Sequence, residues 1–344
     1  MSLASALKTG DLTELPSRRD EDWRWTDLRG LIRALPPVSP KFEGEVGAGP
    51  FVAGETLTLV NGQGSIDLTV AAGETNVVAL RLISATASTA HAGRARITVG
   101  EGARLTLLES HEGLADGYLS EIALDIRLAK DAVVERIVLA SDTAEAVSVV
   151  DAEVALAAGA KYAQTILTSG ARRQRLETRV AHPGAHADLR LDGIYLLDAQ
   201  RHADLTTQVA HGGVDGTTSQ LTKGMVADQA RGVFQGRIIV QPGADQTDAR
   251  MGHHALIMSD KAEVDAKPEL LIFADDVSCA HGNTIGALDE QAIFYARQRG
   301  IPEQEARAML TEAFVGEVVE RIEHDAARDV ARTWVAQRLG RSIV

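Results

Sequence analysis

Cys279 and His281 carry the most specific chemistry in this sequence, because a thiol and an imidazole stand two residues apart. The apolar run 269–273 predicts a buried strand, 274–276 predicts its turn, and 277–281 predicts a second extended segment. Residues i and i+2 of a strand point to the same face, so we expect the two side chains to lie side by side. Such a pair suits a transition metal or an iron–sulfur cluster better than a hard cation.

The chain contains a single cysteine, which limits what Cys279 can do alone. It excludes an internal disulfide, so we expect a reducing, cytoplasmic location. It also excludes a four-cysteine cluster site within one chain, so the remaining ligands of any cluster must come from elsewhere. Considered singly, Cys279 also fits an inert buried thiol, and His281 fits an ordinary polar residue at a strand end. Both interpretations stay open at this point.

Other groups of potential ligands are less convincing. His253 and His254 are adjacent, so on a strand they face opposite ways, and we expect them to be structural or exposed. His182 and His186 are four residues apart, but the proline and glycine between them exclude the helix that would align them. The pair Asp275-Asp276 is typical of a turn at a strand end.

The composition restricts the classes of partner and activity. A net charge of −13 and a pI of about 5.3 argue against binding nucleic acid or an anionic membrane. We expect neither a signal peptide nor a membrane span, because no apolar run is long enough. The GxxxxGK[ST] phosphate loop is absent, so no ATP site of that kind is expected, and neither GxSxG nor HExxH occurs. A pair of catalytic carboxylates is not excluded, because acidic residues occur throughout.

Residues 56–295 show the alternation of half-buried strands, most clearly at 121–128, 151–156 and 188–192. A recurrent pattern overlies it, in which an apolar strand end is followed by a small or polar turn and an alanine. The alanines are Ala103, Ala132, Ala160, Ala185 and Ala244. The first four are 29, 28 and 25 residues apart, and the fifth is 59 further on. This recurrence predicts stacked units, most simply the coils of a β-solenoid, with a β-sandwich as the alternative.

The regions on either side of this core are expected to be helical. Residues 1–55 contain a polar helical region with Trp23 and Trp25 as packing anchors, followed by a proline-rich linker. Residues 296–344 are predicted to form amphipathic helices. Their apolar stripe has a four-residue stride: Ala306, Leu310, Phe314, Val318 and Ile322. Such a stripe packs on its own domain more often than in a partner's groove, and both interpretations stay open.

Several segments of the chain resemble the core domain of the SufB/SufD family of iron–sulfur cluster assembly proteins, and SufD more than SufB. The main segments are 259–265, 267–270, 274–277, 279–282 and 289–291, with further ones at 231–236, 246–248 and 19–26. They keep their order and spacing, which is far more specific than one short motif. The resemblance covers most of the chain, although the N-terminal region is shorter than is usual in the family.

The resemblance implies a mainly β fold, a right-handed parallel β-helix flanked by helical ends. It implies a non-catalytic scaffold subunit that supports iron acquisition, pairs with SufB and docks the ATPase SufC. Whether the isolated chain forms a homodimer stays open. His281 and, less strongly, Cys279 would face SufB and share a nascent cluster with it transiently. The C-terminal helices would dock SufC, with Leu310, Phe314 and Val318 as candidate contacts. A solenoid enzyme acting on polysaccharide is the alternative, disfavoured by the 4% content of aromatic residues.

Overall fold

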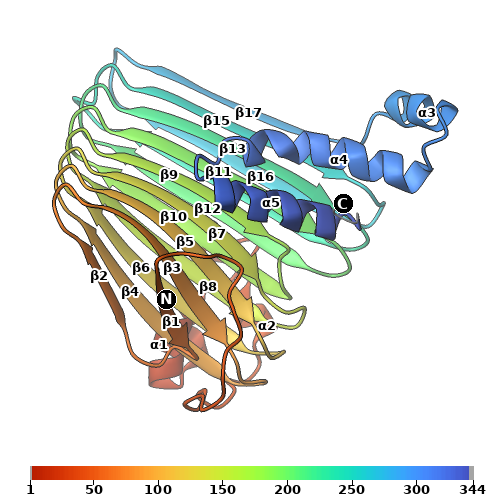
Figure 1. The fold of residues 1–344 in the computed structure, drawn as a ribbon, viewed down its shortest axis with the longest axis horizontal. Helices are drawn as coiled ribbons and strands as arrows, with labels where there is room; N and C mark the ends of the chain where they lie inside the picture. The colour runs from red at the N-terminus through yellow and green to blue at the C-terminus, as the bar shows by residue number, and fades with distance from the viewer. Residues whose placement is uncertain (1, 341–344) are drawn as a thin grey trace.

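The core of the protein is a parallel β-solenoid. The computed structural model describes residues 2–340, and within that range the strands form a nine-stranded and an eight-stranded sheet (Figure 1). Odd-numbered strands build the first sheet, in the order β1 to β17, and even-numbered strands build the second, in the order β16 to β2. Each strand therefore pairs in parallel with the strand two positions away along the chain. The predicted parallel solenoid is confirmed, and the β-sandwich alternative is wrong.

Most strands are ten residues long and are joined by short turns. The nine-stranded sheet contains β1 (Glu55–Val60), β3 (Thr75–Ser84), β5 (Arg104–Gly113), β7 (Val133–Ser141), β9 (Lys161–Thr168), β11 (Asp188–Leu197), β13 (Thr217–Val226), β15 (Asp248–Ile257) and β17 (Ser278–Gly286). The eight-stranded sheet contains β2 (Ile66–Val70), β4 (Ala90–Val99), β6 (Leu119–Leu128), β8 (Val147–Leu156), β10 (Arg173–His182), β12 (His202–His211), β14 (Arg231–Val240) and β16 (Glu263–Ile272).

The strand register explains the recurrent alanine. Arg104, Val133, Lys161 and Asp188 are register partners along the nine-stranded sheet. The residue before each of them is a buried alanine: Ala103, Ala132, Ala160 and Ala187. The turn after β10 is longer than the turn after β8, so Ala187 takes this position rather than Ala185. The turn after β14 is longer still: Ala244 is buried in the interior, as Ala103, Ala132 and Ala160 are, but Thr247 stands directly before β15.

Alternate residues of both sheets point into one continuous interior, made mainly of Val, Leu, Ile and Ala. A polar cluster is enclosed within it. Arg136 donates to both carboxylate oxygens of Glu109, at 2.7 and 2.8 Å, and to Oε1 of Gln164 at 2.8 Å. His111 Nε2 lies 2.6 Å from Oε1 of the same carboxylate. Burial opposes ionisation of Glu109, but Arg136 and His111 outweigh it and lower its pKa to about 2.

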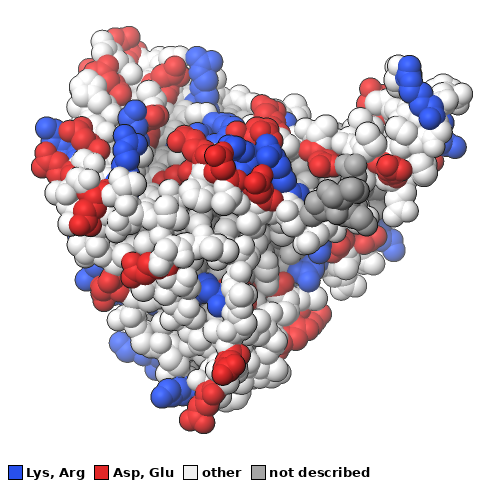
Figure 2. Space-filling view, viewed as in Figure 1, with Lys and Arg blue, Asp and Glu red and all other residues white. Residues whose placement is uncertain are grey.

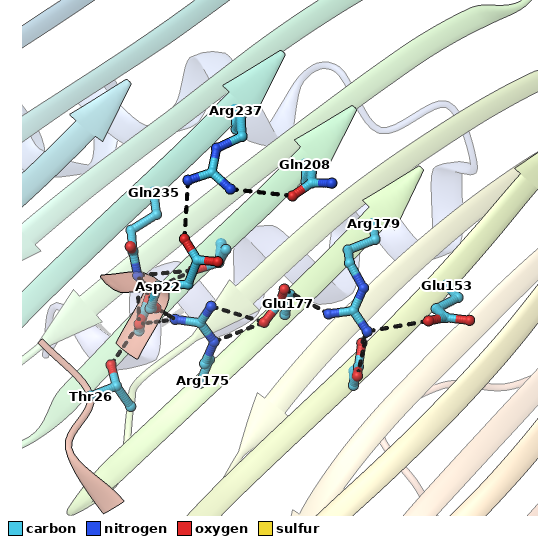
Figure 3. A network of polar contacts seen from close by, with 12 residues as sticks. Asp22, Thr26, Glu153, Arg175, Glu177, Arg179, Gln208, Gln235 and Arg237 are labelled. Atoms are coloured by element: carbon cyan, nitrogen blue, oxygen red, sulfur yellow. Dashed lines mark hydrogen bonds and ion pairs between the residues drawn. The ribbon is translucent and has the colours of Figure 1, made fainter. Parts of the chain in front are cut away.

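The N-terminal segment consists of short helices laid on the outer face of the eight-stranded sheet. They are α1 (Leu3–Thr9), η1 (Leu12–Glu14), η2 (Glu21–Trp23) and α2 (Leu28–Leu31). Arg175 donates to Asp204 at 2.7 Å and to the Asp22 carbonyl at 2.8 Å (Figure 3). Its guanidinium lies 4.5 Å from the Trp23 ring centre. Thr26 donates to the same Asp204 at 2.5 Å. Trp23 therefore serves as a packing anchor, as predicted.

Three helices follow the solenoid: α3 (Glu290–Gln298), α4 (Glu303–Val319) and α5 (Asp325–Arg338). Figure 1 shows α4 and α5 lying across the nine-stranded sheet, whereas α3 projects beyond it. The apolar residues of α4 and α5 share a buried cluster with the outward side chains of β5, β7, β9 and β11. Helix α3 begins inside the range 56–295 that the sequence assigned to the core. The last four residues of the predicted 296–344 region lie outside the described residues.

Charges of both signs are interspersed on the face shown in Figure 2, without a continuous basic surface. Oppositely charged side chains meet where α4 and α5 join, for example Arg332 with Glu320 at 2.8 Å and Arg190 with Glu323 at 3.0 Å. In the described part of the chain, none of the helices has the length and apolar character needed to cross a bilayer.

Candidate functional site

The solenoid ends at β16 and β17, and we call residues 263–286 the open end. Within residues 2–340, β16 pairs only with β14 and β17 only with β15 in the two sheets, so each has an unpaired edge. Large apolar side chains are exposed here, with Phe273 62% exposed and Leu271, Ile272 and Ile285 each about 40% exposed. The strand at 269–273 was predicted correctly, but its burial was not. The strand is partly exposed because, in the described residues, no further coil packs on the coil that contains it.

Cys279 and His281 both lie on β17, in the extended conformation predicted from their spacing. Their register partners on β15 are Ala249 and Met251, which are buried in the solenoid interior. The thiol and the imidazole therefore continue an inward-facing column at the point where the interior opens to solvent. Cys279 is half-buried against the core, and His281 is exposed.

The surroundings of Cys279 favour the neutral thiol. Burial raises the pKa of this thiol above its usual 9.0; the Ala249 backbone lowers it by a smaller amount, and the carboxylate of Asp248 adds the smallest effect, which raises it. A metal ion or cluster iron must therefore displace a proton to bind here. The site differs in this respect from an activated nucleophilic cysteine, which needs a lowered pKa.

The open end supplies only part of a ligand set. Among the residues that the structure describes, no three His, Cys, Asp or Glu side chains are grouped to hold a metal ion. Cys279 and His281 are nevertheless suitable donors for iron, since thiolate and imidazole are its common protein ligands. Both lie at an exposed edge, where a second chain can approach and add further donors. The arrangement can therefore take part in a shared site but cannot complete one.

His253 supports β17 from the preceding coil, which the sequence did not reveal. Its ring stacks on Phe234 with centres 4.7 Å apart, and its Nε2 lies 2.9 Å from the Tyr195 hydroxyl. Its Nδ1 lies 2.7 Å from Oδ1 of Asn283, two residues beyond His281. Burial lowers the pKa of His253 to about 4, so it is neutral under ordinary conditions. The predicted structural interpretation fits this environment, and His254 faces the opposite way, toward Thr284.

The remaining candidates do not join the open end. His182 is not grouped with His186; it packs edge-on against His211 inside the solenoid, with ring centres 3.9 Å apart. His186 is exposed and lies 3.5 Å from Asp215. Asp275-Asp276 forms the turn before β17, as predicted, and the Asp276 carbonyl accepts from Gln246 at 2.6 Å.

The apolar stripe of the C-terminal region mostly packs on the chain's own core. Val318 is fully buried in the cluster against the nine-stranded sheet. Leu310 and Phe314 are half-buried, in contact with a small cluster that contains Ile293 of α3 and Leu256 of β15. The exposed apolar residues of the C-terminal helices are instead Phe294 and Tyr295, each about 60% exposed, and Met309, which is 39% exposed. The sequence placed 294–295 in the β core and so gave no signal for them.

Comparisons with known proteins agree with the architecture. The model of the SUF system FeS cluster assembly SufBD core domain matches residues 82–314. The chain is 29% identical to the iron–sulfur cluster assembly protein SufD of Escherichia coli, over 98% of this chain and 91% of that protein. It is 28% identical to a SufBD family protein of Synechocystis over 67% of this chain and 52% of the relative. SufD of Bacillus subtilis is 34% identical over 35% of this chain and 27% of its own length.

Proposed function

The chain belongs to the SufBD family of iron–sulfur cluster assembly proteins, and we propose that it acts as a SufD-like, non-catalytic scaffold subunit in the cytoplasm. In this proposal its open end pairs with SufB, and a nascent cluster is the shared, transient substrate of the two chains. The single observation that carries the proposal is the position of Cys279 and His281, side by side on the terminal strand of an open solenoid.

The unpaired edges of β16 and β17 support pairing with another chain. An exposed edge strand presents free N–H and C=O groups, which favour addition of a strand from a partner. The exposed Phe273 and Ile285 add apolar area that a partner would cover. An isolated chain would use the same edges to pair with a second copy of itself. SufB would then compete with that copy and supply the cysteines that complete the ligand set.

The projecting arm formed by α3 and the start of α4 is the surface that we propose for SufC. Phe294, Tyr295 and Met309 are exposed on this arm, and α3 projects away from the solenoid (Figure 1). Exposed aromatic residues and methionine are the residue types that dominate protein interfaces. We therefore assign the contact with SufC to these residues in place of Val318, which is buried against the nine-stranded sheet. ATP would be bound by SufC, because this chain has no phosphate loop of the expected kind.

The test compares His281→Asn with the matched substitution His186→Asn. His186 is exposed and distant from the open end along the chain, and its φ of 58° is one that asparagine tolerates. Each variant is assembled with SufB and SufC, and cluster absorbance is recorded under identical anaerobic, reducing conditions. We expect His281→Asn to assemble normally but to lose most of the absorbance, and His186→Asn to match the wild type.

Two results would contradict the assignment. Equal absorbance in His281→Asn and wild type would mean that the imidazole is not a ligand. Loss of the complex in size-exclusion chromatography would mean that His281 contributes to the interface rather than to the cluster.

A further inference from the structure

A second site lies at one corner of the solenoid, where three consecutive turns run from the nine-stranded to the eight-stranded sheet. A cavity of about 610 Å³ is lined there by the turns at 144–145, 172–173 and 199–201, and by Leu31 at the end of α2. A neighbouring cavity of similar volume shares Leu31, Glu145 and Arg172 with it. We call the first of these the corner cavity. Neither Cys279 nor His281 lines it.

The corner cavity carries a positive charge on a strongly acidic protein. Its charged lining consists of three arginines, Arg172, Arg173 and Arg201, and one carboxylate, Glu145. The net charge of the whole chain is −13, so this concentration of guanidinium groups is not a consequence of composition. A cluster of one sign in a concave site raises the local concentration of ions of the opposite sign.

Arg173 is the least compensated of the three. Its Nη1 donates to the carbonyl of Arg172 at 3.0 Å, and its Nε is buried without a partner in the described structure. Burial lowers the pKa of this guanidinium, and the positive charges of Arg231 and Arg172 lower it further, while only Asp27 acts in the opposite direction. A bound anion would relieve this unfavourable environment.

The other two arginines are placed to act with it. Arg201 Nη1 is fixed by the carbonyls of Gly170 and Asp142, at 2.6 and 3.2 Å, and the nearest paired carboxylate, of Asp198, is 3.9 Å away. Arg172 reaches Glu145 at 3.7 Å, with both side chains more than half exposed. Such an exposed pair is weak, so an incoming anion can displace the carboxylate.

We propose that the corner cavity binds a small ligand carrying a phosphate or diphosphate group. Guanidinium groups recognise phosphate and carboxylate oxygens through paired hydrogen bonds. Three arginines and one carboxylate leave a net charge of +2, which a ligand with a single carboxylate would balance only by half. A phosphate group carries about −2, and a diphosphate carries at least as much. The site binds through arginine side chains rather than through a glycine-rich loop, so the missing phosphate-loop motif is no objection.

The test is titration calorimetry of the full chain with inorganic pyrophosphate, in parallel with citrate as a polycarboxylate of similar charge. We expect one pyrophosphate per chain, bound more tightly than citrate and more weakly as the salt concentration rises. Arg173→Gln and Arg172→Gln are each expected to weaken binding about tenfold or more, the effect of losing one charged hydrogen bond. Arg172 is exposed, so its variant keeps the test valid if Arg173→Gln fails to fold.

Arg250→Gln is the matched control, because Arg250 is an exposed arginine on β15 of the other sheet. It removes the same charge and is expected to leave pyrophosphate binding unchanged. Absence of binding, or equal affinity in wild type, Arg172→Gln and Arg173→Gln, would overturn the site. Citrate binding as tightly as pyrophosphate would overturn the assignment to phosphate. None of these outcomes depends on cluster assembly at the open end.

Discussion

The enclosed ion pair of Glu109 and Arg136 offers the sharpest quantitative test of how the solenoid interior is held. Both side chains are essentially inaccessible to solvent, with exposures of 0% and 1%, and the guanidinium contacts both carboxylate oxygens. Removing one partner leaves the other as an uncompensated charge in an apolar interior. We therefore expect Glu109→Leu and Arg136→Met each to lower the free energy of unfolding by about 3–5 kcal/mol.

The double variant is expected to be far less damaging than the sum of the two single variants. Replacing both charges by apolar groups removes the buried ion entirely, which is often close to neutral. Here His111 is left without its carboxylate partner, at about 1–3 kcal/mol, whereas Gln164 Oε1 still accepts from the Tyr162 hydroxyl at 2.8 Å. The two single variants sum to about 6–10 kcal/mol, so we expect a coupling of about 3 kcal/mol or more, at the top of the range for contacting residues.

The same pair predicts a specific dependence on pH. The folded pKa of Glu109, about 2, lies below its usual 4.5, so its contribution is present above pH 4.5 and is lost as the pH falls toward 2. The difference corresponds to about 3 kcal/mol. Wild type should lose this amount between pH 4.5 and 2, and Glu109→Leu should not.

The assay is equilibrium urea unfolding of the two single variants, the double variant and wild type. The control is the exposed pair Arg96–Asp125, 3.4 Å apart with Arg96 half exposed, whose coupling should be about 1 kcal/mol or less. Additive effects of Glu109→Leu and Arg136→Met, within about 0.5 kcal/mol, would refute the reasoning. So would an unchanged acid sensitivity in Glu109→Leu.

Three further predictions concern the proposed function. Cys279→Ser should retain more cluster absorbance than His281→Asn, because SufB can supply another thiolate; the reverse order would contradict the ligand assignment. Since burial raises the pKa of the Cys279 thiol, cluster formation should increase as the pH rises from neutral toward 9, and this increase should be smaller in Cys279→Ser. Replacing Phe294 and Tyr295 together by serine should weaken SufC binding by about 2 kcal/mol or more, roughly thirtyfold. SufC binding is measured by surface plasmon resonance, with Leu114→Ser, at another exposed apolar residue, as the control. Unchanged SufC affinity in the double variant would mean that SufC binds another surface.

The repeating part of the fold was predictable because each coil has a recognisable pattern within its own stretch of sequence. Alternation at 121–128 identifies a strand with one buried face, and the buried alanines Ala103, Ala132 and Ala160 mark equivalent corners. The pattern failed at Ala185, where the turn after β10 is one residue longer, and at Ala244 it found a buried alanine but not the residue directly before β15. An insertion in an outer turn leaves the strand register intact, so the structure tolerates it while the spacing in the sequence changes.

The C-terminal stripe illustrates a different limit. Its four-residue stride predicts an amphipathic helix, and α4 is that helix. The stride does not indicate which surface the apolar face of the helix covers. Val318 shares a buried cluster with side chains more than a hundred residues earlier in the chain, including Leu167 and Ile194. A chain ending near residue 300 would therefore expose the outer apolar face of the nine-stranded sheet. For this reason point substitutions on α3 test the SufC dock better than a truncation does.

The candidate site shows why the end of a solenoid is the hardest part to predict. Cys279 and His281 occupy inward positions that are chemically equivalent to those of Ala249 and Met251 one coil earlier. An inward residue of an inner coil is enclosed by the next coil, whereas the same position in the last coil faces solvent. The sequence around β17 contains no local signal that this is the last coil. Burial was therefore predicted for 269–273, and the structure shows it to be incomplete. The same termination leaves a thiol and an imidazole at an unpaired edge, and an incomplete ligand set is useful only where a second chain can reach it.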